Sequence, residues 1–322
     1  MTLSRTPLLL ALLASLGVAH AADIQNTQPR TTDLSTIDVK AMADRDATPG
    51  TGLDSYGNAS LHDTPASVTV VSRQQIDDRQ IRTLSELARE DASLGDNYAP
   101  VGYYQDIAIR GYPLDLATGL RLNNLTIAGE QPVAMEDKQH VQILKGLAGL
   151  EAGVMEPGGV VNYVSKRPDD VRSATLGVDS HGSRYGALDV GGWLTPAFGV
   201  RLNAAYEDTH SYVQHADGRR NFYAAAIDWN ISPKATLQLD GNYQTSAQRS
   251  VSGYQLLGGH TIPDHASTTR MLGFQPWQKP VDIHAANSSA RFAYAFNEDW
   301  RLRLSAGHSR SRSGPTTAAA RR

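Results

Sequence analysis

Apolar and polar residues alternate along most of the C-terminal half of the chain. In Val200–Asp208, Leu202 and Tyr206 fall on one face, while Arg201 and Asn203 fall on the other. A period of two is the pattern of a β-strand with one apolar and one polar face. The alternation recurs in segments near residues 173–180, 185–194, 200–208, 222–230, 236–244, 290–296 and 300–306. The pattern therefore predicts seven antiparallel strands after Pro168.

The connections between these strands alternate in length. Soluble β-sandwiches also alternate apolar and polar residues, so periodicity alone leaves the class of sheet open. Short connections at 195–199, 231–234 and 297–299 alternate with long ones at 209–221 and 245–287. Short turns at one end and long loops at the other are typical of an outer-membrane β-barrel.

The tryptophans of this region support the same class. Trp193, Trp229 and Trp300 all lie beside short turns. Membrane barrels carry girdles of aromatic residues where the strands meet the lipid interface. The alternative is three unrelated, buried tryptophans, which their consistent placement disfavours.

The number of predicted strands is odd and small for a barrel. An open sheet would leave two unpaired edges in lipid, where each orphan backbone group costs several kcal/mol. We therefore expect that the chain does not close a barrel by itself. Strand alternation stops near Ser309, so residues 310–322 are expected to form an irregular tail of the kind that a truncation or frame shift leaves.

The N-terminus has the parts of a secretory signal peptide. Arg5 supplies a positive charge, Pro7–Val18 is an apolar run, and Ala19-His20-Ala21 gives the small residues of an A-x-A site that is cleaved after Ala21. A retained membrane anchor is the alternative, but a helical span takes about 20 apolar residues. We expect a signal peptide at 1–21, a flexible leader at 22–60, and export to the bacterial outer membrane.

Composition narrows the chemistry further. The chain contains no cysteine, which excludes thiolate metal sites and cysteine nucleophiles, and its net charge of −3 argues against nucleic acid as a partner. The motifs of common hydrolases and nucleotide-binding enzymes are missing from the sequence. The histidines His260, His265 and His284 lack metal-ligand spacing. We expect no enzyme, no cofactor and no metal site.

Residues 61–168 predict a small α/β domain. Ser72 with Gln75 and Thr83 with Glu86 have the spacing of capping boxes, which predicts a helix start after each. A strand is expected before Ser72. Further strands are expected at 106–112, 120–127 and 141–144, with glycine turns at 146, 149, 153, 158 and 159.

Four segments of this domain resemble the plug of TonB-dependent siderophore receptors, in that family's order and spacing. They are Thr64-Pro-Ala-Ser-Val-Thr-Val-Val-Ser-Arg, Ile109-Arg-Gly-Tyr-Pro-Leu, Val141-Gln-Ile-Leu-Lys-Gly and Pro157-Gly-Gly-Val-Val-Asn-Tyr-Val-Ser-Lys-Arg-Pro. The resemblance covers about residues 35–309. It implies a plug at 61–168 inside a β-barrel of about 22 antiparallel strands, of which this chain would hold about seven, at 173–309.

The chain departs from the family pattern in places. Leu147 stands where the family usually has proline, and Ala152 where it often has an aromatic residue. Asn123-Asn124 replaces an Asn-Gly turn, which is tolerable because asparagine also adopts positive φ.

The leader contains a segment that resembles a TonB box, formed by Thr36, Ile37, Asp38, Val39 and Lys40. The resemblance implies that this peptide contacts the TonB energy-coupling protein. Backbone hydrogen bonds of an added strand would supply affinity, and the alternating Ile37 and Val39 would fix register. An ordinary disordered linker is the alternative.

Arg110 and three tyrosines are the candidate ligand-binding residues. Ferric chelates are often anionic and carry flat, polarisable groups, which suit a guanidinium and phenols. We therefore expect Arg110 to line an outward-facing pocket with Tyr98, Tyr103 and Tyr104. The alternatives are that Arg110 pairs with a carboxylate of the barrel wall and that the tyrosines only pack a loop.

Other charged residues of the domain are expected to have structural roles. Lys145, Lys166, Arg167 and the acidic Glu136 are candidates for ion pairs between plug and barrel wall.

The resemblance implies an outer-membrane receptor for ferric siderophores, with TonB, membrane lipid and the ferric siderophore as partners. Two alternatives remain open from the sequence. One is a product with a plug and a few strands that transports nothing. The other is TonB-dependent import of a different ligand, such as cobalamin or a glycan.

Overall fold

The computed structural model describes residues 64–98, 101–146, 156–252 and 256–315, all within one compact unit. The expected signal peptide, the leader with its TonB box, and the glycine turns at 149 and 153 lie outside these residues.

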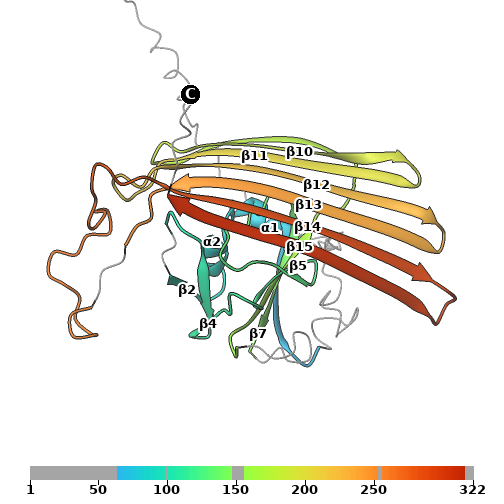
Figure 1. Cartoon of the computed structure of the whole chain (residues 1–322), viewed down its shortest axis with the longest axis horizontal. Coiled ribbons are helices and arrows are strands. Elements are labelled where there is room, and N and C mark those ends of the chain that lie inside the picture. Colours follow the sequence, from blue (N-terminus) through green and yellow to red (C-terminus); the bar gives the residue numbers. More distant parts are fainter. Residues whose placement is uncertain (1–63, 99–100, 147–155, 253–255, 316–322) are drawn as a thin grey trace, which may run out of the picture. The chain divides into compact units, whose positions relative to one another are not determined.

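Seven long strands form one antiparallel sheet in which each strand pairs with its neighbours in the chain (Figure 1). They are β9 (Val171–Val178), β10 (Arg184–Thr195), β11 (Phe198–Thr209), β12 (Gly218–Ser232), β13 (Ala235–Gln248), β14 (Val281–Ala295) and β15 (Arg301–Pro315). We refer to this sheet as the wall. Its number of strands confirms the prediction, and β9 and β15 are its two edges.

The strands at the end of the wall are longer than expected. β15 pairs with β14 as far as Pro315, so residues 310–315 continue the strand and are not part of an irregular tail. The ladder is made by backbone groups, so serine and arginine side chains do not interrupt it. β14 begins at Val281, so His284 lies on this strand and not in the long connection before it. That connection spans residues 249–280.

The two faces of the wall differ as the alternation predicted. Leu202 and Tyr206 are 53% and 51% exposed, whereas Arg201 and Asn203 on the other face are 9% and 6% exposed. An apolar outer surface and a polar inner surface characterise barrel strands that face lipid. Among the described residues, no helix is long and apolar enough to cross a membrane.

The three wall tryptophans are exposed, which rules out the alternative that they are buried. Trp193 and Trp229 lie near the ends of their strands, and Trp300 lies in the short turn before β15. All three are therefore at the short-turn end of the wall, as an aromatic girdle requires.

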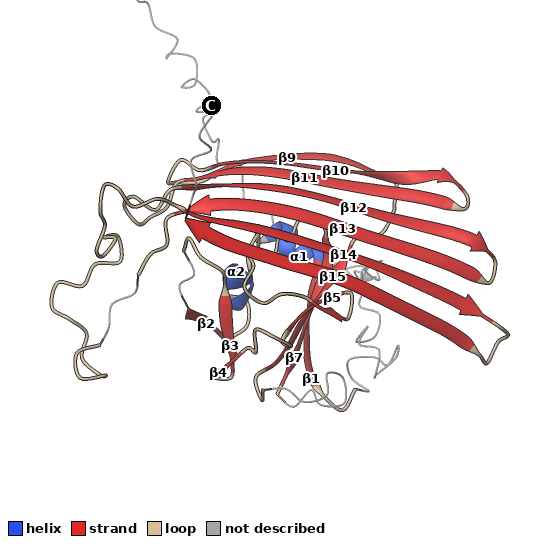
Figure 2. Ribbon diagram, viewed as in Figure 1, coloured by secondary structure: helices blue, strands red, loops and turns tan. Residues whose placement is uncertain are grey.

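The described residues before Pro168 form the plug, which holds two small sheets and two short helices (Figure 2). The first sheet has the order β1-β7-β8-β5-β6 and the second β2-β3-β4. The strands of the first sheet are β1 (Ser67–Ser72), β5 (Leu120–Leu122), β6 (Leu125–Thr126), β7 (Lys138–Lys145) and β8 (Gly159–Ser165). The remaining elements are α1 (Arg73–Asp78), α2 (Leu84–Ala88), β2 (Leu94–Tyr98), β3 (Asp106–Ile109) and β4 (Tyr112–Pro113).

Both helices begin where the sequence predicted. Ser72 and Thr83 accept hydrogen bonds from the backbone N–H of Gln75 and Glu86, whose side chains accept from the cap backbone in return. These capping boxes satisfy N–H groups that the first helical turn leaves without partners. The buried side chains Ile76 and Leu87 then attach the helices to the plug core.

Two predicted strands are in fact tight hairpins. Asn123 and Asn124 have φ of 51° and 68°, so they form the turn between β5 and β6. Arg110 and Gly111 have φ of 54° and 82° and separate β3 from β4, which breaks the strand expected at 106–112. Two consecutive residues with positive φ are the signature of a two-residue hairpin turn.

Candidate functional site

The plug lies against the polar face of the wall through buried ion pairs. Arg220 on β12 contacts Glu136 of the plug at 2.6 Å and Glu207 on β11 at 3.0 Å. Glu207 also pairs at 2.9 Å with Arg82, which precedes α2. The four residues form a continuous chain of alternating charge that joins the plug to two wall strands.

Glu136 is charged in this setting. Burial by itself would raise the pKa of its carboxyl group, but the Arg220 guanidinium and its hydrogen bonds outweigh burial and hold the pKa below its ordinary value. Tyr185 on β10 donates a further hydrogen bond to Glu136. A buried ion that is fully paired and hydrogen-bonded avoids the large cost of an isolated buried charge.

Two further residues predicted to form ion pairs, Lys166 and Arg167, join plug and wall. Lys166 contacts Asp189 on β10 at 2.7 Å, and Arg167 pairs with Asp228 on β12 and Asp240 on β13. Together with Glu136, these residues confirm the expected structural role.

Lys145 does not reach the wall, which corrects the expectation for that residue. It pairs with Asp91 inside the plug. The reason is its position at the end of β7, where it faces the loop between α2 and β2.

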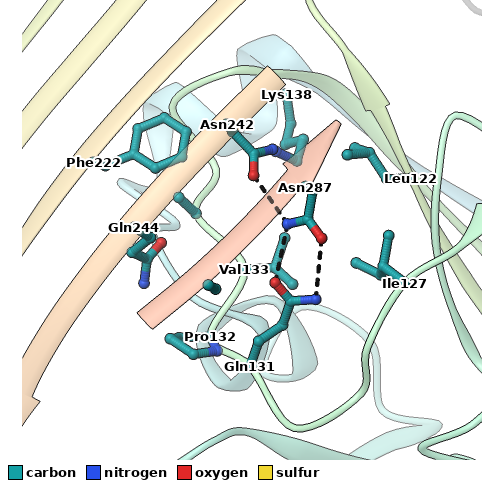
Figure 3. Close-up of a pocket in the computed structure, with 12 residues that line it drawn as sticks. Leu122, Ile127, Gln131, Pro132, Val133, Lys138, Phe222, Asn242, Gln244 and Asn287 are labelled. Atoms are coloured by element: carbon teal, nitrogen blue, oxygen red, sulfur yellow. Dashed lines mark hydrogen bonds between the residues drawn. The ribbon is translucent and has the colours of Figure 1, made fainter. Parts of the chain in front are cut away.

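Toward β14 and β15, amides and hydroxyls make most of the contacts between plug and wall. Asn287 on β14 donates to Gln131 of the plug at 3.0 Å and to Asn242 on β13 at 2.9 Å, as Figure 3 shows. Ser309 on β15 accepts a hydrogen bond from the backbone N–H of Ala128 at 2.8 Å. The void beside this chain of side chains is about 10 Å³, which holds about one water molecule. The plug and the wall are therefore closely packed here.

A larger cavity of about 520 Å³ lies between the plug and strands β9–β11. Arg82, Glu136 and Lys166 line it, and each of these charged groups is engaged in the ion pairs described above. None of the candidate tyrosines lines this cavity.

The three candidate tyrosines lie together at the end of the β2–β3 hairpin. The ring centroids of Tyr103 and Tyr104 are 4.7 Å apart. The ring centroid of Tyr98 lies 6.1 Å from that of Tyr103 and 5.7 Å from that of Tyr104. Tyr98 is 51% exposed. We call these three residues the tyrosine cluster; it offers aromatic faces and phenol groups to solvent.

The long connections of the wall reach the loop that carries the tyrosine cluster. The N–H of Val251 donates to the carbonyl of Val101 at 3.1 Å, and a Cβ on Gly102 would lie 2.1 Å from the carbonyl oxygen of Arg249. The connection after β13 also packs against the one after β11, through Val213, Ala216 and Met271. The tyrosine cluster is therefore at the long-loop end of the wall.

Arg110 is not part of the tyrosine cluster. Tyr98 pairs with Asp106 at the start of β3, whereas Arg110 follows the last residue of that strand, about 13 Å farther along. Its guanidinium donates to the hydroxyl of Ser67 at 2.8 Å. The structure thus places Arg110 with the start of β1, apart from the other candidates, and its described hydrogen bond goes to a plug hydroxyl instead of a wall carboxylate.

Sequence reasoning missed two acidic neighbours of the tyrosine cluster, Asp106 and Glu130. Both influence the Tyr104 phenol, whose pKa is raised first by burial and then by the charge of Glu130, with smaller contributions from Tyr103 and Asp106. Glu130 is 26 positions from Tyr104 in the sequence, and nothing in its local sequence signals the contact. Among the described residues, no group of histidine and acidic side chains has the arrangement of a metal site.

Comparisons with known proteins show what this chain is similar to. The family described as TonB-dependent Receptor Plug Domain matches residues 60–160. The ferripyoverdine receptor of Pseudomonas aeruginosa is 28% identical over 194 residues, which cover 56% of this chain and 23% of that protein.

Two other relatives extend the comparison along the chain. The metal-pseudopaline receptor CntO of Pseudomonas aeruginosa is 28% identical over 291 residues, covering 84% of this chain and 40% of its own. The ferrichrome receptor FcuA of Yersinia enterocolitica is 26% identical over 266 residues, covering 79% and 34%. The chain thus spans between 23% and 40% of the length of these relatives.

The fold is shared with solved receptor structures. The crystal structure of BauA, the ferric preacinetobactin receptor of Acinetobacter baumannii, superimposes with a TM-score of 0.72 at 23% identity, covering 79% of this chain and 39% of that one. The chain is therefore similar to the TonB-dependent siderophore receptors: residues 60–160 match the model of their plug domain, and the antiparallel strands that follow share the fold of a solved receptor.

Proposed function

We propose that this chain belongs to an outer-membrane receptor that binds ferric siderophores on the outside of the cell and imports them with energy delivered through TonB. The observation that carries the proposal is the plug held against the polar face of the wall by the Glu136–Arg220–Glu207–Arg82 chain. A domain fastened inside a barrel blocks it, so transport requires that these contacts rearrange.

The two ends of the wall have different roles in this proposal. The long connections and the tyrosine cluster form the outer entrance, where the ferric chelate binds. The short turns and the exposed tryptophans form the periplasmic end. The relatives named for ferripyoverdine and ferrichrome support the ligand class.

The leader supplies the energy contact. Thr36, Ile37, Asp38, Val39 and Lys40 would add a strand to a sheet of TonB, as an extended peptide does in β-augmentation. Pulling on this segment acts on β1, the first described strand of the plug and an edge strand of its sheet.

The proposal is tested by growth under iron limitation. Deletion of the gene that encodes this chain in its host is expected to abolish growth on at least one purified ferric siderophore, and the restored gene should rescue it. An Ile37→Pro variant should fail to rescue, because proline removes a backbone donor from the added strand. A Thr32→Pro variant, in the same leader but outside the TonB box, is the matched control and should rescue fully. Unchanged growth of the deletion strain on every siderophore tried would refute the proposal.

One relative suggests a second ligand class. The receptor CntO is named for metal-pseudopaline, and it matches 84% of this chain. The same deletion strain, tested for growth with other metal–chelator complexes in place of iron, distinguishes the two.

A further inference from the structure

The tyrosine cluster is accompanied by a buried carboxylate with an unused acceptor. Asp106 is 8% exposed, and it lies directly opposite Tyr98 in the β2–β3 ladder. Its Oδ2 accepts a hydrogen bond from the side chain of Asn97 at 2.7 Å. Its Oδ1 accepts none from the residues that the structure describes. A buried carboxylate oxygen in this state favours a donor or a positive charge nearby.

A second carboxylate lies on the plug loop before β7. Glu130 is exposed, and its backbone carbonyl accepts a hydrogen bond from the hydroxyl of Ser311 on β15 at 2.6 Å. This bond fixes the Glu130 backbone relative to the wall. Ser311 lies near the end of β15, at the long-loop end of the wall, so Glu130 is at the same end as the tyrosine cluster. The pKa of Tyr104, which is raised by burial first and by Glu130 next, agrees with this placement.

Two arginines in this part of the chain have their guanidinium groups engaged elsewhere. Arg110 is at the opposite end of β3 and donates to Ser67. The backbone of Arg249 touches the loop at Gly102, but its guanidinium donates to the carbonyls of Gln278 and His215 and lies 5.8 Å from the Phe274 ring centroid. Among the described residues, neither Asp106 nor Glu130 is paired with a cation, so both carboxylates contribute negative charge at the tyrosine cluster.

We propose that the tyrosine cluster, with Asp106 and Glu130, selects ferric chelates that are neutral or positively charged, such as hydroxamate complexes, over polyanionic catecholate complexes. This inference rests on the proposed function and adds the charge class of its ligand. Singly charged hydroxamates neutralise a ferric ion, whereas doubly charged catecholates leave the complex strongly negative. A polyanion would be repelled by both carboxylates, and phenol groups can donate hydrogen bonds to hydroxamate oxygens.

The experiment measures binding of ferric chelates to the purified full chain in detergent, by quenching of its aromatic fluorescence. A neutral and a cationic ferric hydroxamate are compared with a ferric tris-catecholate of similar size at low ionic strength, where charge effects are least screened. We expect the hydroxamates to bind at least about tenfold more tightly, which corresponds to about 1.4 kcal/mol.

Charge-neutralising variants assign the preference to these residues. Glu130 is exposed and glutamine has nearly the same shape, so the Glu130→Gln variant should fold normally. It should reduce the ratio of hydroxamate affinity to catecholate affinity severalfold, and Asp106→Asn should reduce this ratio further. Asp78→Asn, an exposed change on α1, is the matched control and should leave the ratio unchanged. Circular dichroism verifies that each variant is folded.

The outcomes separate the two proposals. Tighter binding of the catecholate would overturn the charge selectivity and leave the receptor function standing. A preference that survives Glu130→Gln undiminished would also overturn it, because another part of the chain would then set the selectivity. Binding of none of the chelates would overturn the charge selectivity as well, whereas the receptor function is decided by the growth experiment described above.

Discussion

Gly159 shows how one residue connects distant parts of the plug. Its φ is +130°, and a Cβ at this position would lie 2.0 Å from the carbonyl oxygen of Leu144 on β7. The neighbouring Gly158 is confined as well, since its Cβ would lie 2.9 Å from the carbonyl oxygen of Pro113 on β4. The Pro-Gly-Gly motif before β8 therefore lets the chain pass close to a strand of each plug sheet.

We predict that Gly159→Ala destabilises the plug by about 3 kcal/mol or more, because it combines a strained backbone with a clash against a β7 carbonyl. The measurement is the urea concentration at which trypsin begins to cleave within the plug. Gly95→Ala is the control: Gly95 lies on β2, and nothing lies within 4 Å of its added Cβ. Equal cleavage midpoints for the two variants would contradict the close approach at Gly159.

At the scale of elements, the carboxylate of Asp91 ties the loop before β2 to two strands of the first plug sheet. It accepts hydrogen bonds from Thr69 on β1, from Ser93 and from Lys145 on β7. Burial raises the pKa of this carboxyl group, but the hydrogen bonds from Lys145, Ser93 and Thr69 together exceed that effect and hold the pKa well below its ordinary value. Asp91 thus fastens β1, the strand nearest to the leader, to the rest of the plug.

The hydrogen bonds of Asp91 predict that the stability of the plug depends on pH. Because the pKa of Asp91 is lower in the folded than in the unfolded chain, its stabilisation is fully present above the ordinary carboxyl range near pH 4 and is lost as the pH falls below it. Asp91→Asn should cost about 3 kcal/mol at pH 7, since it leaves Lys145 unpaired in a mostly buried site.

Hydrogen exchange of the β1 and β7 amides, measured at pH 7 and at about pH 3 and corrected for intrinsic rates, tests this prediction. The difference between wild type and Asp91→Asn should shrink at the lower pH. Asp78→Asn, which changes an exposed carboxylate, should show little difference at either pH. A difference in hydrogen exchange between wild type and Asp91→Asn that stays constant with pH would contradict the stabilising role of the ionised Asp91.

At the scale of the molecule, the plug is held to the wall by two kinds of contact. Ion pairs dominate toward β10–β13, whereas neutral amides and hydroxyls dominate toward β14 and β15. The neutral contacts lack buried charges, so they can separate without leaving an ion unpaired. Any release of the plug would therefore be less costly on the β14–β15 side.

The contact between Ala128 and Ser309 can be tested by a disulfide. The 2.8 Å hydrogen bond between them places their Cα atoms within the separation of about 4.4–6.8 Å that disulfides require. The chain contains no cysteine, so the double variant Ala128→Cys with Ser309→Cys adds only this pair. Oxidation should give a faster-migrating band on a non-reducing gel.

Ala128→Cys with Ser313→Cys is the matched pair, because Ser313 lies on the same strand about 13 Å farther along. It should cross-link poorly. Similar yields for the two pairs would mean that plug and wall do not hold the described register.

Features that depend on neighbouring residues in the chain were predictable from the sequence. The capping boxes at Ser72 and Thr83 need residues three positions apart. The faces of β11 follow from the two-residue period of a strand, which places Arg201 inside and Leu202 outside whatever lies across the sheet. The seven wall strands and the exposed tryptophans were predictable for the same reason.

Features that depend on contacts distant in the sequence required the tertiary structure. The partner of Lys145 is 54 residues away in the sequence, and the ion pair between Arg82 and Glu207 joins residues 125 positions apart. The separation of Arg110 from the tyrosines follows from a turn whose positive φ no local pattern announced. The sequence by itself determined the family resemblance, the faces of the strands and the helix starts, because these are local. Only the tertiary structure decided which charges meet, because that depends on how the plug packs against the wall.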